Sequence, residues 1–351
     1  MRDRDALEMT VRFFDGHQVR VLVSEQSDVG ECRRVAKRLA EAAKFDETTA
    51  GRACLVATEL ATNVFRHAGS GELLVQVLDD GETTVLEILA IDCGSGMRDV
   101  DECLRDGFST AGTPGNGLGA VARMSSTFDI FSITGQGSVV LSRISNKPVR
   151  PSFKSSSSPG FEFGAICVAI SGEVDCGDAW CIGNSGDAVA ILVADGLGHG
   201  PLAARASSDA VRCFKKNPLE APAAMMKDLH GALAGGRGAA AACALLRVSA
   251  SKAIYAGVGN ISGHLLSGEH SRGMVSHNGT LGVQLLRSQQ FEYDWQPGSR
   301  IVMHSDGVSG RWSIGSYPGL HMKHPAIIAG ALYRDFVRRR DDATIVVGCH
   351  R

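Results

Sequence analysis

The sequence contains no apolar run approaching the ~18 residues needed to cross a bilayer, and its first residues lack the apolar stretch of a signal peptide. We therefore expect a soluble, cytoplasmic protein with no membrane partner. The formal net charge is only −2, which gives no broad attraction to nucleic acid, so we expect no nucleic-acid partner. The ten cysteines include no Cys-x-x-Cys pair and several lie within apolar runs, which favours reduced core residues over a disulfide framework.

The length of 351 residues, with 44% hydrophobic residues, is sufficient for two domains. A polar, proline-punctuated segment rich in serine occupies residues 146–160 and has the composition of a linker. The sequence therefore predicts one domain over residues 1–145, a linker over 146–160 and a second domain over 161–351.

The first domain alternates between helical and strand patterns. Apolar residues at helical spacing predict helices over residues 28–44 and 48–67. A strand is predicted over 18–23, and alternating runs predict antiparallel hairpins over 73–89 and 128–144. These elements indicate an α+β domain with one sheet and helices on one of its faces.

Short strands dominate the second domain, with a few long helices between them. The strands are predicted over 165–171, 179–182, 189–194, 240–248, 253–257, 264–266, 300–304 and 344–349, and the helices over 202–214, 222–233 and 325–338. This pattern favours a two-sheet sandwich with helices packed outside.

Two segments of the first domain suit a nucleotide. Glu59 and Asn63 are four residues apart on a predicted helix, so both can share one magnesium ion through its water shell. Asp92 follows a predicted strand and precedes Gly94 and Gly96, where the backbone can approach a flat ligand and the carboxylate can accept an adenine hydrogen bond. Taken alone, the first pair is typical of a solvated helix face and the second of a turn.

A third segment is the glycine-rich loop Gly115-Asn116-Gly117-Leu118-Gly119. It enters a helix predicted over residues 118–125, so its backbone N–H groups can point at a phosphate. A lone glycine loop indicates little, but the three segments in this order predict an ATP site.

Carboxylates mark the ends of strands in the second domain. Asp195, Asp306 and Asp341 each adjoin a predicted strand, and strand ends from different parts of a sandwich can converge. Clustered carboxylates repel one another unless hard cations such as Mg²⁺ or Mn²⁺ neutralise them. Two such cations can activate a water and brace the oxygens of a phosphate. Asp-Gly is also a common turn dipeptide, so only the joint pattern predicts a metal site.

The first domain resembles the GHKL (Bergerat) ATP-binding fold of histidine kinases and bacterial anti-sigma serine kinases, over roughly residues 19–144. Residues 59–68 look like its N box, residues 92–96 like its adenine-binding glycine box, and residues 106–110 are similar to RsbT-type switch kinases. The resemblance implies that Glu59 is a general base and that Asn63 is a magnesium ligand. It also implies that Asp92, with Gly94 and Gly96, contacts adenine, and that Gly117, Leu118 and Gly119 form a phosphate loop. No phosphoacceptor histidine domain precedes this half, so we expect transfer to a serine or threonine of a separate protein.

The second domain resembles the PPM-type metal-dependent serine/threonine phosphatases, an αββα sandwich, in the bacterial branch that includes SpoIIE and RsbX. The matching motifs are residues 195–200, 305–308 and 341–344, with additional similarity at 257–261 to which no chemistry is assigned. The resemblance implies that Asp195 bridges two metals, that the Gly196 carbonyl binds one, and that Asp306 and Asp341 complete the other.

The resemblance also places an upstream acidic residue that acts mainly through metal-bound water. Asp178 fits this position, and Asp175 competes for it. His199 can orient a nearby group or make a structural hydrogen bond, and Arg237 can meet a substrate phosphate or lie exposed without that role.

Together the resemblances imply a bifunctional bacterial partner-switching regulator that uses ATP, Mg²⁺ and Mn²⁺. Its kinase and phosphatase domains would act on a serine or threonine of a STAS-type antagonist protein, with a sigma factor or downstream regulator as a further partner. One alternative is a first domain that only sequesters a regulator in an ATP-dependent way. Another is a first domain that senses nucleotide and controls the phosphatase without transferring phosphate.

Overall fold

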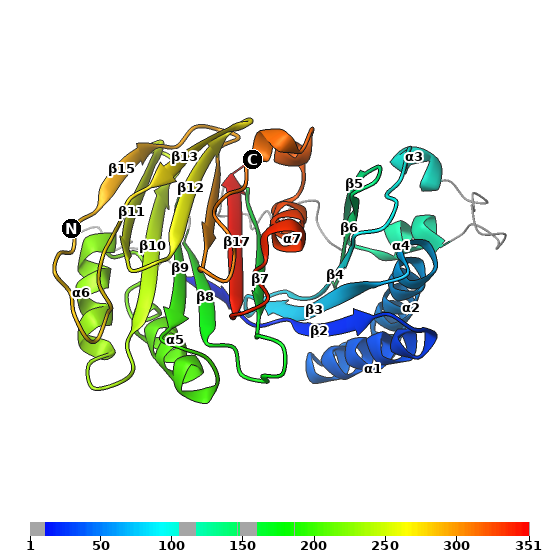
Figure 1. Ribbon diagram of the computed structural model, residues 1–351, viewed down its shortest axis with the longest axis horizontal. Helices are drawn as coiled ribbons and strands as arrows, with labels where there is room; N and C mark the ends of the chain where they lie inside the picture. Colours follow the sequence, from blue (N-terminus) through cyan, green and yellow to red (C-terminus); the bar gives the residue numbers. More distant parts are fainter. Residues whose placement is uncertain (1–10, 105–116, 146, 148–159, 186, 351) are drawn as a thin grey trace, which may run out of the picture.

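The computed structural model describes residues 11–104, 117–145, 147, 160–185 and 187–350 (Figure 1). The predicted kinase segment 106–110, Gly115, Asn116 and nearly all of the predicted linker lie outside these residues. The described chain forms one N-terminal sheet with its helices and a C-terminal sandwich of two sheets. The predicted α+β class with two regions is therefore confirmed.

The N-terminal sheet is antiparallel, with its strands in the order β2-β3-β4-β6-β5. The predicted hairpins are present as the pairs β3–β4 and β5–β6, and pairing of β4 with β6 joins them into one sheet. Its strands are β2 (Val19–Val23), β3 (Gly71–Asp79), β4 (Thr84–Asp92), β5 (Thr127–Ile133) and β6 (Gly137–Ser145).

Helices cover one face of this sheet. They are α1 (Gln26–Ala42), α2 (Glu47–Asn63), a π-helical turn that continues α2 (Val64–Ala68), α3 (Val100–Cys103) and α4 (Gly117–Met124). Helix α2 begins where the Asp46 carboxylate accepts a hydrogen bond from Thr49 N at 2.9 Å, a standard N-cap. Alternate strand residues such as Leu73, Ile88 and Val140 pack against α1 and α2 in one apolar cluster.

The opposite face is covered by α7 (Pro325–Phe336), which belongs to the C-terminal part (Figure 1). The remaining strand residues, among them Leu74, Leu89 and Val139, form a second apolar cluster with this helix. Both faces of β4 and β6 are therefore covered, and nearly every residue of these two strands is buried. The prediction of helices on one face is right for the helices of the first domain but incomplete for the sheet as a whole.

Two glycines allow α7 to lie close to a sheet on each side. A Cβ atom on Gly330 would lie 2.7 Å from Val139 Cγ1 of the N-terminal sheet. On the other side, a Cβ atom on Gly164 would lie 2.1 Å from the backbone nitrogen of Ala326 in α7. Because neither position has room for a side chain, α7 packs tightly between the two parts of the protein.

The C-terminal part is a sandwich of two antiparallel-rich sheets. One has the order β1-β8-β9-β10-β11-β14, with β15 also paired to β11, and the other has the order β13-β12-β16-β17-β7. Helices α5 (Pro201–Phe214) and α6 (Pro222–Ala232) cover the first sheet and α7 covers the second, which gives the predicted αββα layers. Short 3₁₀ turns occur at Ile314–Ser316 and Leu320–Met322. The strands of the two sheets are β1 (Arg12–Asp15), β7 (Phe161–Val168), β8 (Asp178–Ser185), β9 (Ala188–Gly196), β10 (Ala239–Arg247), β11 (Lys252–Val258), β12 (Ser262–Ser267), β13 (His270–Met274), β14 (Ser276–His277), β15 (Phe291–Asp294), β16 (Arg300–His304) and β17 (Ala343–His350).

Strand β1 joins the C-terminal sheet although it precedes every element of the N-terminal domain. Its residues pair antiparallel with β8, Arg12 opposite Asn184 and Asp15 opposite Cys181. The range predicted for the first domain, residues 1–145, thus includes a strand of the second sheet. Sequence patterning cannot reveal this crossover, because the partner of a strand is set by contacts distant in sequence.

A buried polar network joins the two parts beside β7. Arg143 forms a 2.7 Å ion pair with Glu87, both side chains being only 2% exposed, and it also donates to Phe163 O at 2.9 Å. Gln76 donates to the Glu87 carboxylate at 2.6 Å and to Ala165 O at 3.2 Å. Since a buried charge that loses its partner destabilises a protein strongly, this network fixes how the two parts meet.

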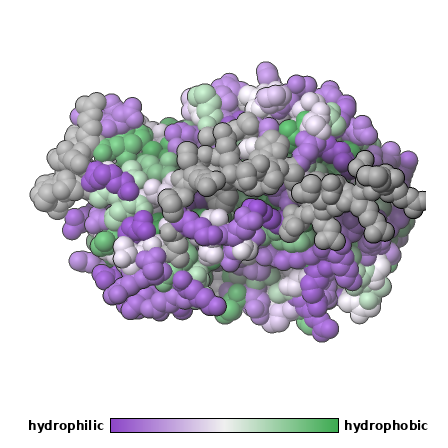
Figure 2. All heavy atoms as spheres, turned by 180° about the vertical axis from the view of Figure 1, so that it is seen from behind, coloured by the Kyte–Doolittle hydropathy of each residue, from purple (hydrophilic) through white to green (hydrophobic). Residues whose placement is uncertain are grey.

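No helix among the described residues is both long and apolar enough to cross a membrane. The face shown in Figure 2 is mainly hydrophilic, with hydrophobic side chains in separate areas among the polar ones. Most large apolar side chains are instead gathered in four internal clusters, two of which contain residues of both parts of the protein.

Candidate functional site

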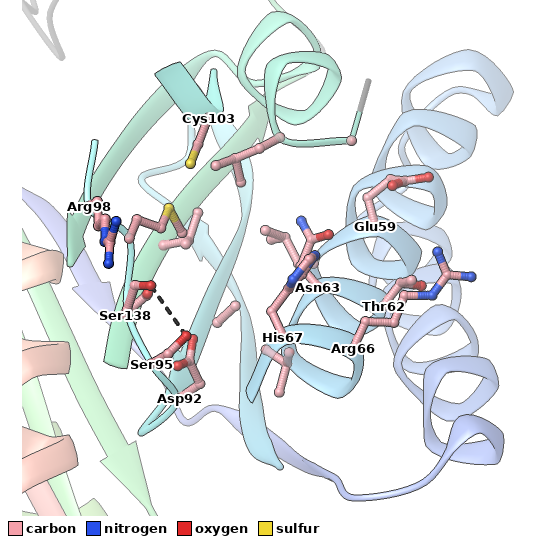
Figure 3. Close-up of a pocket in the computed structure, with 18 of the residues that line it drawn as sticks. Glu59, Thr62, Asn63, Arg66, His67, Asp92, Ser95, Arg98, Cys103 and Ser138 are labelled. Atoms are coloured by element: carbon pink, nitrogen blue, oxygen red, sulfur yellow. Dashed lines mark hydrogen bonds between the residues drawn. The ribbon is translucent and has the colours of Figure 1, made fainter. Parts of the chain in front are cut away.

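A cavity of about 890 Å³ lies between α2 and the strands β4 and β6. Figure 3 shows Glu59, Asn63 and His67 on its helical side and Asp92 and Arg98 across from them. Of the residues predicted to hold the nucleotide, those that line the cavity are Glu59, Asn63, Asp92, Gly96, Gly117 and Leu118. The volume is within the range of small-molecule sites.

Glu59 and Asn63 lie one helical turn apart at the end of α2, where the helix meets the start of α4. A Cβ atom on Gly117 would lie 2.9 Å from Glu59 Oε2 and 3.8 Å from Asn63 Oδ1. The carboxylate and the amide therefore adjoin the first residue of α4, whose free backbone N–H groups can receive a phosphate. The same side of the cavity also includes Arg66 and His67.

Asp92 ends β4, and its Oδ1 accepts a hydrogen bond from Gly94 N at 2.8 Å. Burial raises the pKa of Asp92, while backbone N–H groups of Gly94 and Ser138 and the charge of Arg334 oppose this rise. Because Arg334 lies on α7, the second domain contributes to the electrostatics of the predicted adenine contact.

The glycines of the predicted nucleotide site have different surroundings. A Cβ atom on Gly96, which has φ +66°, would lie 2.2 Å from Ile133 O, and one on Gly94 would lie 2.6 Å from Ala68 Cβ. Gly94 and Gly119 are not among the residues that line the cavity, and Gly119 is buried within α4. Ser95 of the 92–96 segment lines it as well, together with Arg98 and Ser138, which lie outside the motifs.

The second group of predicted residues meets at one end of the sandwich. Asp178 and Asp195 are paired residues of the antiparallel strands β8 and β9. Asp306 follows β16, and Asp341 precedes β17, which pairs with β16. The strand ends therefore converge as the sequence predicted.

These carboxylates perturb one another. Burial raises the pKa of Asp195 to about 7, and the carboxylates of Asp306 and Asp341 add to the rise. Burial, with the neighbouring Asp195 carboxylate, also raises the pKa of Asp178 well above its usual value. The pKa of Asp341 is raised by burial and by Asp306 as well. Such a set of oxygen donors is stabilised in its charged form by a hard divalent cation.

Among the described residues, the carboxylates of this cluster do not form a group of three ligand atoms that all lie within 4.8 Å of one another. A magnesium ion keeps several waters and is usually held by one or two carboxylates, so it does not require such a close group.

Three polar residues that sequence reasoning left without a role support the carboxylates. Asn260 Nδ2 donates to Asp306 Oδ2 at 2.7 Å, and a hydrogen bond from Asn260 also lowers the pKa of Asp195. Ser305 Oγ donates to Asp178 Oδ2 at 2.6 Å. The Asp342 carboxylate accepts from both ends of the loop between β7 and β8, from Ile170 N at 2.8 Å and Gly177 N at 2.7 Å. Asn260 lies in the 257–261 motif, which was the available signal.

The remaining predicted residues surround this cluster. Gly196 ends β9, and a Cβ atom there would lie 2.2 Å from Ala203 O, so a side chain is excluded. His199 is exposed and lies 3.0 Å from Glu173 Oε1. Arg237 donates to Leu197 O at 3.3 Å. Asp175 is exposed, whereas Asp178 is buried opposite Asp195, which favours Asp178 for the upstream acidic position.

Comparison with known proteins finds a different family along each half of the chain. The histidine kinase-like ATPase domain family matches residues 22–144, and the stage II sporulation protein E (SpoIIE) family matches residues 185–350. The serine/threonine-protein kinase RsbT of Bacillus subtilis (strain 168) is 30% identical over 120 residues, which are 34% of this chain and 90% of RsbT. The chain belongs to the RsbT family and carries a SpoIIE domain. It thus combines an RsbT-like, kinase-like domain with a SpoIIE-like domain.

Two solved structures are also similar to part of this chain. A chain from a study of the bacterial stressosome, described as a modular system adapted to control secondary messenger signalling, is 26% identical, with a TM-score of 0.51. The match covers 54% of this chain and 98% of that one. A structure of RsbX in complex with magnesium is 21% identical with a TM-score of 0.48, over 54% of this chain and 96% of RsbX.

Proposed function

We propose that this protein is a bifunctional partner-switching enzyme that phosphorylates and dephosphorylates a serine or threonine of a STAS-type antagonist protein. One observation carries the proposal. Glu59 and Asn63 line a nucleotide-sized cavity together with Asp92, in a chain whose second domain gathers four carboxylates at one end of a sandwich. The RsbT relationship supports a protein hydroxyl as the phosphate acceptor.

In the kinase direction, Glu59 accepts the proton of the partner's hydroxyl as its oxygen bonds to the γ-phosphorus of ATP, and ADP leaves with the electrons of the broken P–O bond. Asn63 is suited to hold Mg²⁺ on the nucleotide, and Asp92 accepts a hydrogen bond from the adenine amino group. Gly117 and Leu118, with Gly119 behind them, present the N-terminus of α4 to the phosphates.

In the phosphatase direction, water attacks the phosphorus of the phosphorylated partner, and the serine or threonine oxygen leaves and regains a proton. Asp195, the Gly196 carbonyl, Asp306 and Asp341 would hold two divalent cations, and Asp178 would act through water bound to them. When bound, Mg²⁺ or Mn²⁺ would polarise the phosphate ester and lower the pKa of a water. Asn260 and Ser305 orient the carboxylates of Asp306 and Asp178 by hydrogen bonds.

The test compares phosphorylation of the native STAS-type partner by wild type, Glu59→Ala and Asp195→Asn in the presence of ATP. We expect no phosphoprotein with Glu59→Ala. We expect more with Asp195→Asn than with wild type, because the kinase remains and the opposing hydrolysis is lost. Phosphoserine and phosphothreonine are quantified by mass spectrometry. ATP-dependent complex formation with no phosphorylated product in any sample would favour sequestration and contradict the kinase assignment.

A second function, control of the phosphatase by nucleotide, is favoured by the position of α7. Its residue Arg334 acts electrostatically on Asp92 at the ATP cavity. Beyond its C-terminal end, Arg338 N donates to Gly307 O at 2.8 Å, next to Asp306, and the chain then reaches Asp341. One helix thus connects the surroundings of both sites.

Nucleotide control predicts that ATP and ADP change the phosphatase rate on a phosphopeptide that is not the kinase substrate. The variant Asp92→Asn should lose this response while Glu59→Ala keeps it, since only the first is expected to impair nucleotide binding. An identical rate with ATP, with ADP and without nucleotide would contradict this second function.

A further inference from the structure

A group of soft metal ligands lies outside both sites. A ring nitrogen of His17 and the sulfur atoms of Cys167 and Cys176 all lie within 4.8 Å of one another, the cysteines buried and the histidine exposed. The two Sγ atoms are 3.7 Å apart. We propose that His17, Cys167 and Cys176 form a binding site for a zinc-type divalent cation.

The geometry of the two sulfur atoms supports this proposal. A tetrahedral zinc ion with Zn–S bonds of about 2.3 Å holds two thiolate sulfurs about 3.8 Å apart. The observed separation of 3.7 Å therefore needs almost no adjustment of the buried cysteines. Thiolate and imidazole are also the ligands that select zinc over magnesium and manganese. Carboxylates such as those of the aspartate cluster favour magnesium and manganese instead.

His17 is held beside the cysteines by its neighbour in the chain. Gln18 N donates to Cys167 O at 3.1 Å, Gln18 Oε1 accepts from Cys167 N at 2.6 Å, and Gln18 Nε2 donates to Ala165 O at 2.5 Å. Three hydrogen bonds that involve Gln18 thus attach the segment between β1 and β2 to β7. The exposed imidazole can close the site after an ion reaches the two thiols, with water as a fourth ligand.

The location gives the site a consequence for the whole protein. His17 lies between β1 of the C-terminal sheet and β2 of the N-terminal sheet, and its Nε2 is 3.3 Å from Asp178 O. Cys176 is two residues before Asp178 in the chain. An ion at this site would fasten the crossover between the two domains to the strand that begins with the phosphatase residue Asp178.

Cobalt distinguishes this site from the carboxylate cluster. Only sulfur ligands give a thiolate-to-cobalt charge-transfer band, so Co²⁺ bound to carboxylates does not produce one. Co²⁺ is titrated into the reduced full-length protein in excess Mg²⁺. We expect a charge-transfer band that saturates at one equivalent and disappears when Zn²⁺ is added. Cys167→Ser and Cys176→Ser should each abolish the band, and Cys213→Ser is the matched control that should keep it.

His17→Ala keeps the proposal testable if a buried cysteine variant fails to fold, since His17 is exposed. It should weaken Co²⁺ and Zn²⁺ binding at least tenfold, because even partners outside the ligand shell contribute about 10–100-fold. His270→Ala, which changes an exposed histidine on β13, should leave affinity unchanged. Zinc should raise the Tm of the wild type by a few degrees more than that of His17→Ala.

Absence of a thiolate band in the folded wild type would overturn the proposal. A band that Cys176→Ser or His17→Ala leaves unchanged would overturn it too. Neither result bears on the kinase or phosphatase assignments, which are measured separately by phosphate transfer and hydrolysis.

Discussion

Asp178 and Asp195 face each other as paired residues of β8 and β9, and burial raises the pKa of both carboxyl groups. Two carboxylates held together in this way repel each other unless a cation binds between them or one of them takes up a proton. The fold of the sandwich maintains this pairing through seven further residue pairs along the same two strands. The sheet itself therefore holds together two of the carboxylates that we propose for the metal site.

Asp306→Asn and Asp178→Asn should each lower phosphatase kcat/KM at least about 100-fold, because loss even of an outer partner of a metal site costs about 10–100-fold. Both variants should retain the wild-type circular dichroism spectrum. Asp175→Asn is the matched control and should keep the activity, since Asp175 is exposed. Hydrolysis of a phosphopeptide by wild type in excess chelator would contradict the two-metal interpretation.

Manganese affinity should fall as the pH falls below about 7. The pKa of Asp195 is raised to about 7, so below this pH a proton competes with the cation for the carboxylate. If one proton is linked to binding, the manganese dissociation constant rises up to about tenfold for each pH unit below the pKa. Above the pKa it no longer depends on pH. Titration calorimetry between pH 5.5 and 8 measures this dependence. An affinity that is constant over the range would show that Asp195 is not a ligand.

Glu59→Ala should reduce phosphotransfer by about 10²–10⁴-fold, the usual contribution of a general base, with little change in ATP affinity. The reason is that Glu59 adjoins the start of α4, whereas the predicted adenine contact Asp92 lies across the cavity (Figure 3). Asp92→Asn should instead weaken nucleotide binding, which is measured as an increase in the dissociation constant. Full transfer by Glu59→Ala would refute the assignment.

Gly330→Ala should destabilise the full-length protein by about 1–2 kcal/mol, although alanine favours helices over glycine. The added Cβ would lie 2.7 Å from Val139 Cγ1 and 3.1 Å from Leu89 Cδ2, where α7 packs against the N-terminal sheet. Gly231→Ala in α6 is the matched control, because nothing lies within 4 Å of its Cβ position. It should instead stabilise by about 0.5–1 kcal/mol. Urea unfolding measures both, and equal effects would contradict tight packing at α7.

The same contact predicts that residues 1–145 expressed alone will be less stable than in the full chain and will tend to aggregate. Without α7, the apolar side chains of Leu74, Leu89 and Val139 would face water. Thermal unfolding and light scattering of the fragment test this, and ATP binding by a monomeric, stable fragment would show that the interface is dispensable.

Local patterns in the sequence predicted much of the structure. The hairpins β3–β4 and β5–β6 follow from two-residue alternation, and α2 follows from apolar residues at helical spacing. The motifs around Glu59, Asp92, Asp195 and Asp306 also carried the functional hypothesis, because each is written in a few consecutive residues. The comparisons confirmed the two families that these motifs indicated.

What the sequence by itself determined is therefore the local content: the elements, the order of the motifs and the two kinds of chemistry. Only the tertiary structure decided that β1 pairs with β8, that α7 covers the N-terminal sheet, that Asn260 supports Asp306, and that His17 meets Cys167. The physical reason is that each of these contacts joins segments far apart in the chain. Their formation depends on the shape and burial of both partners at once, which no single stretch of sequence encodes.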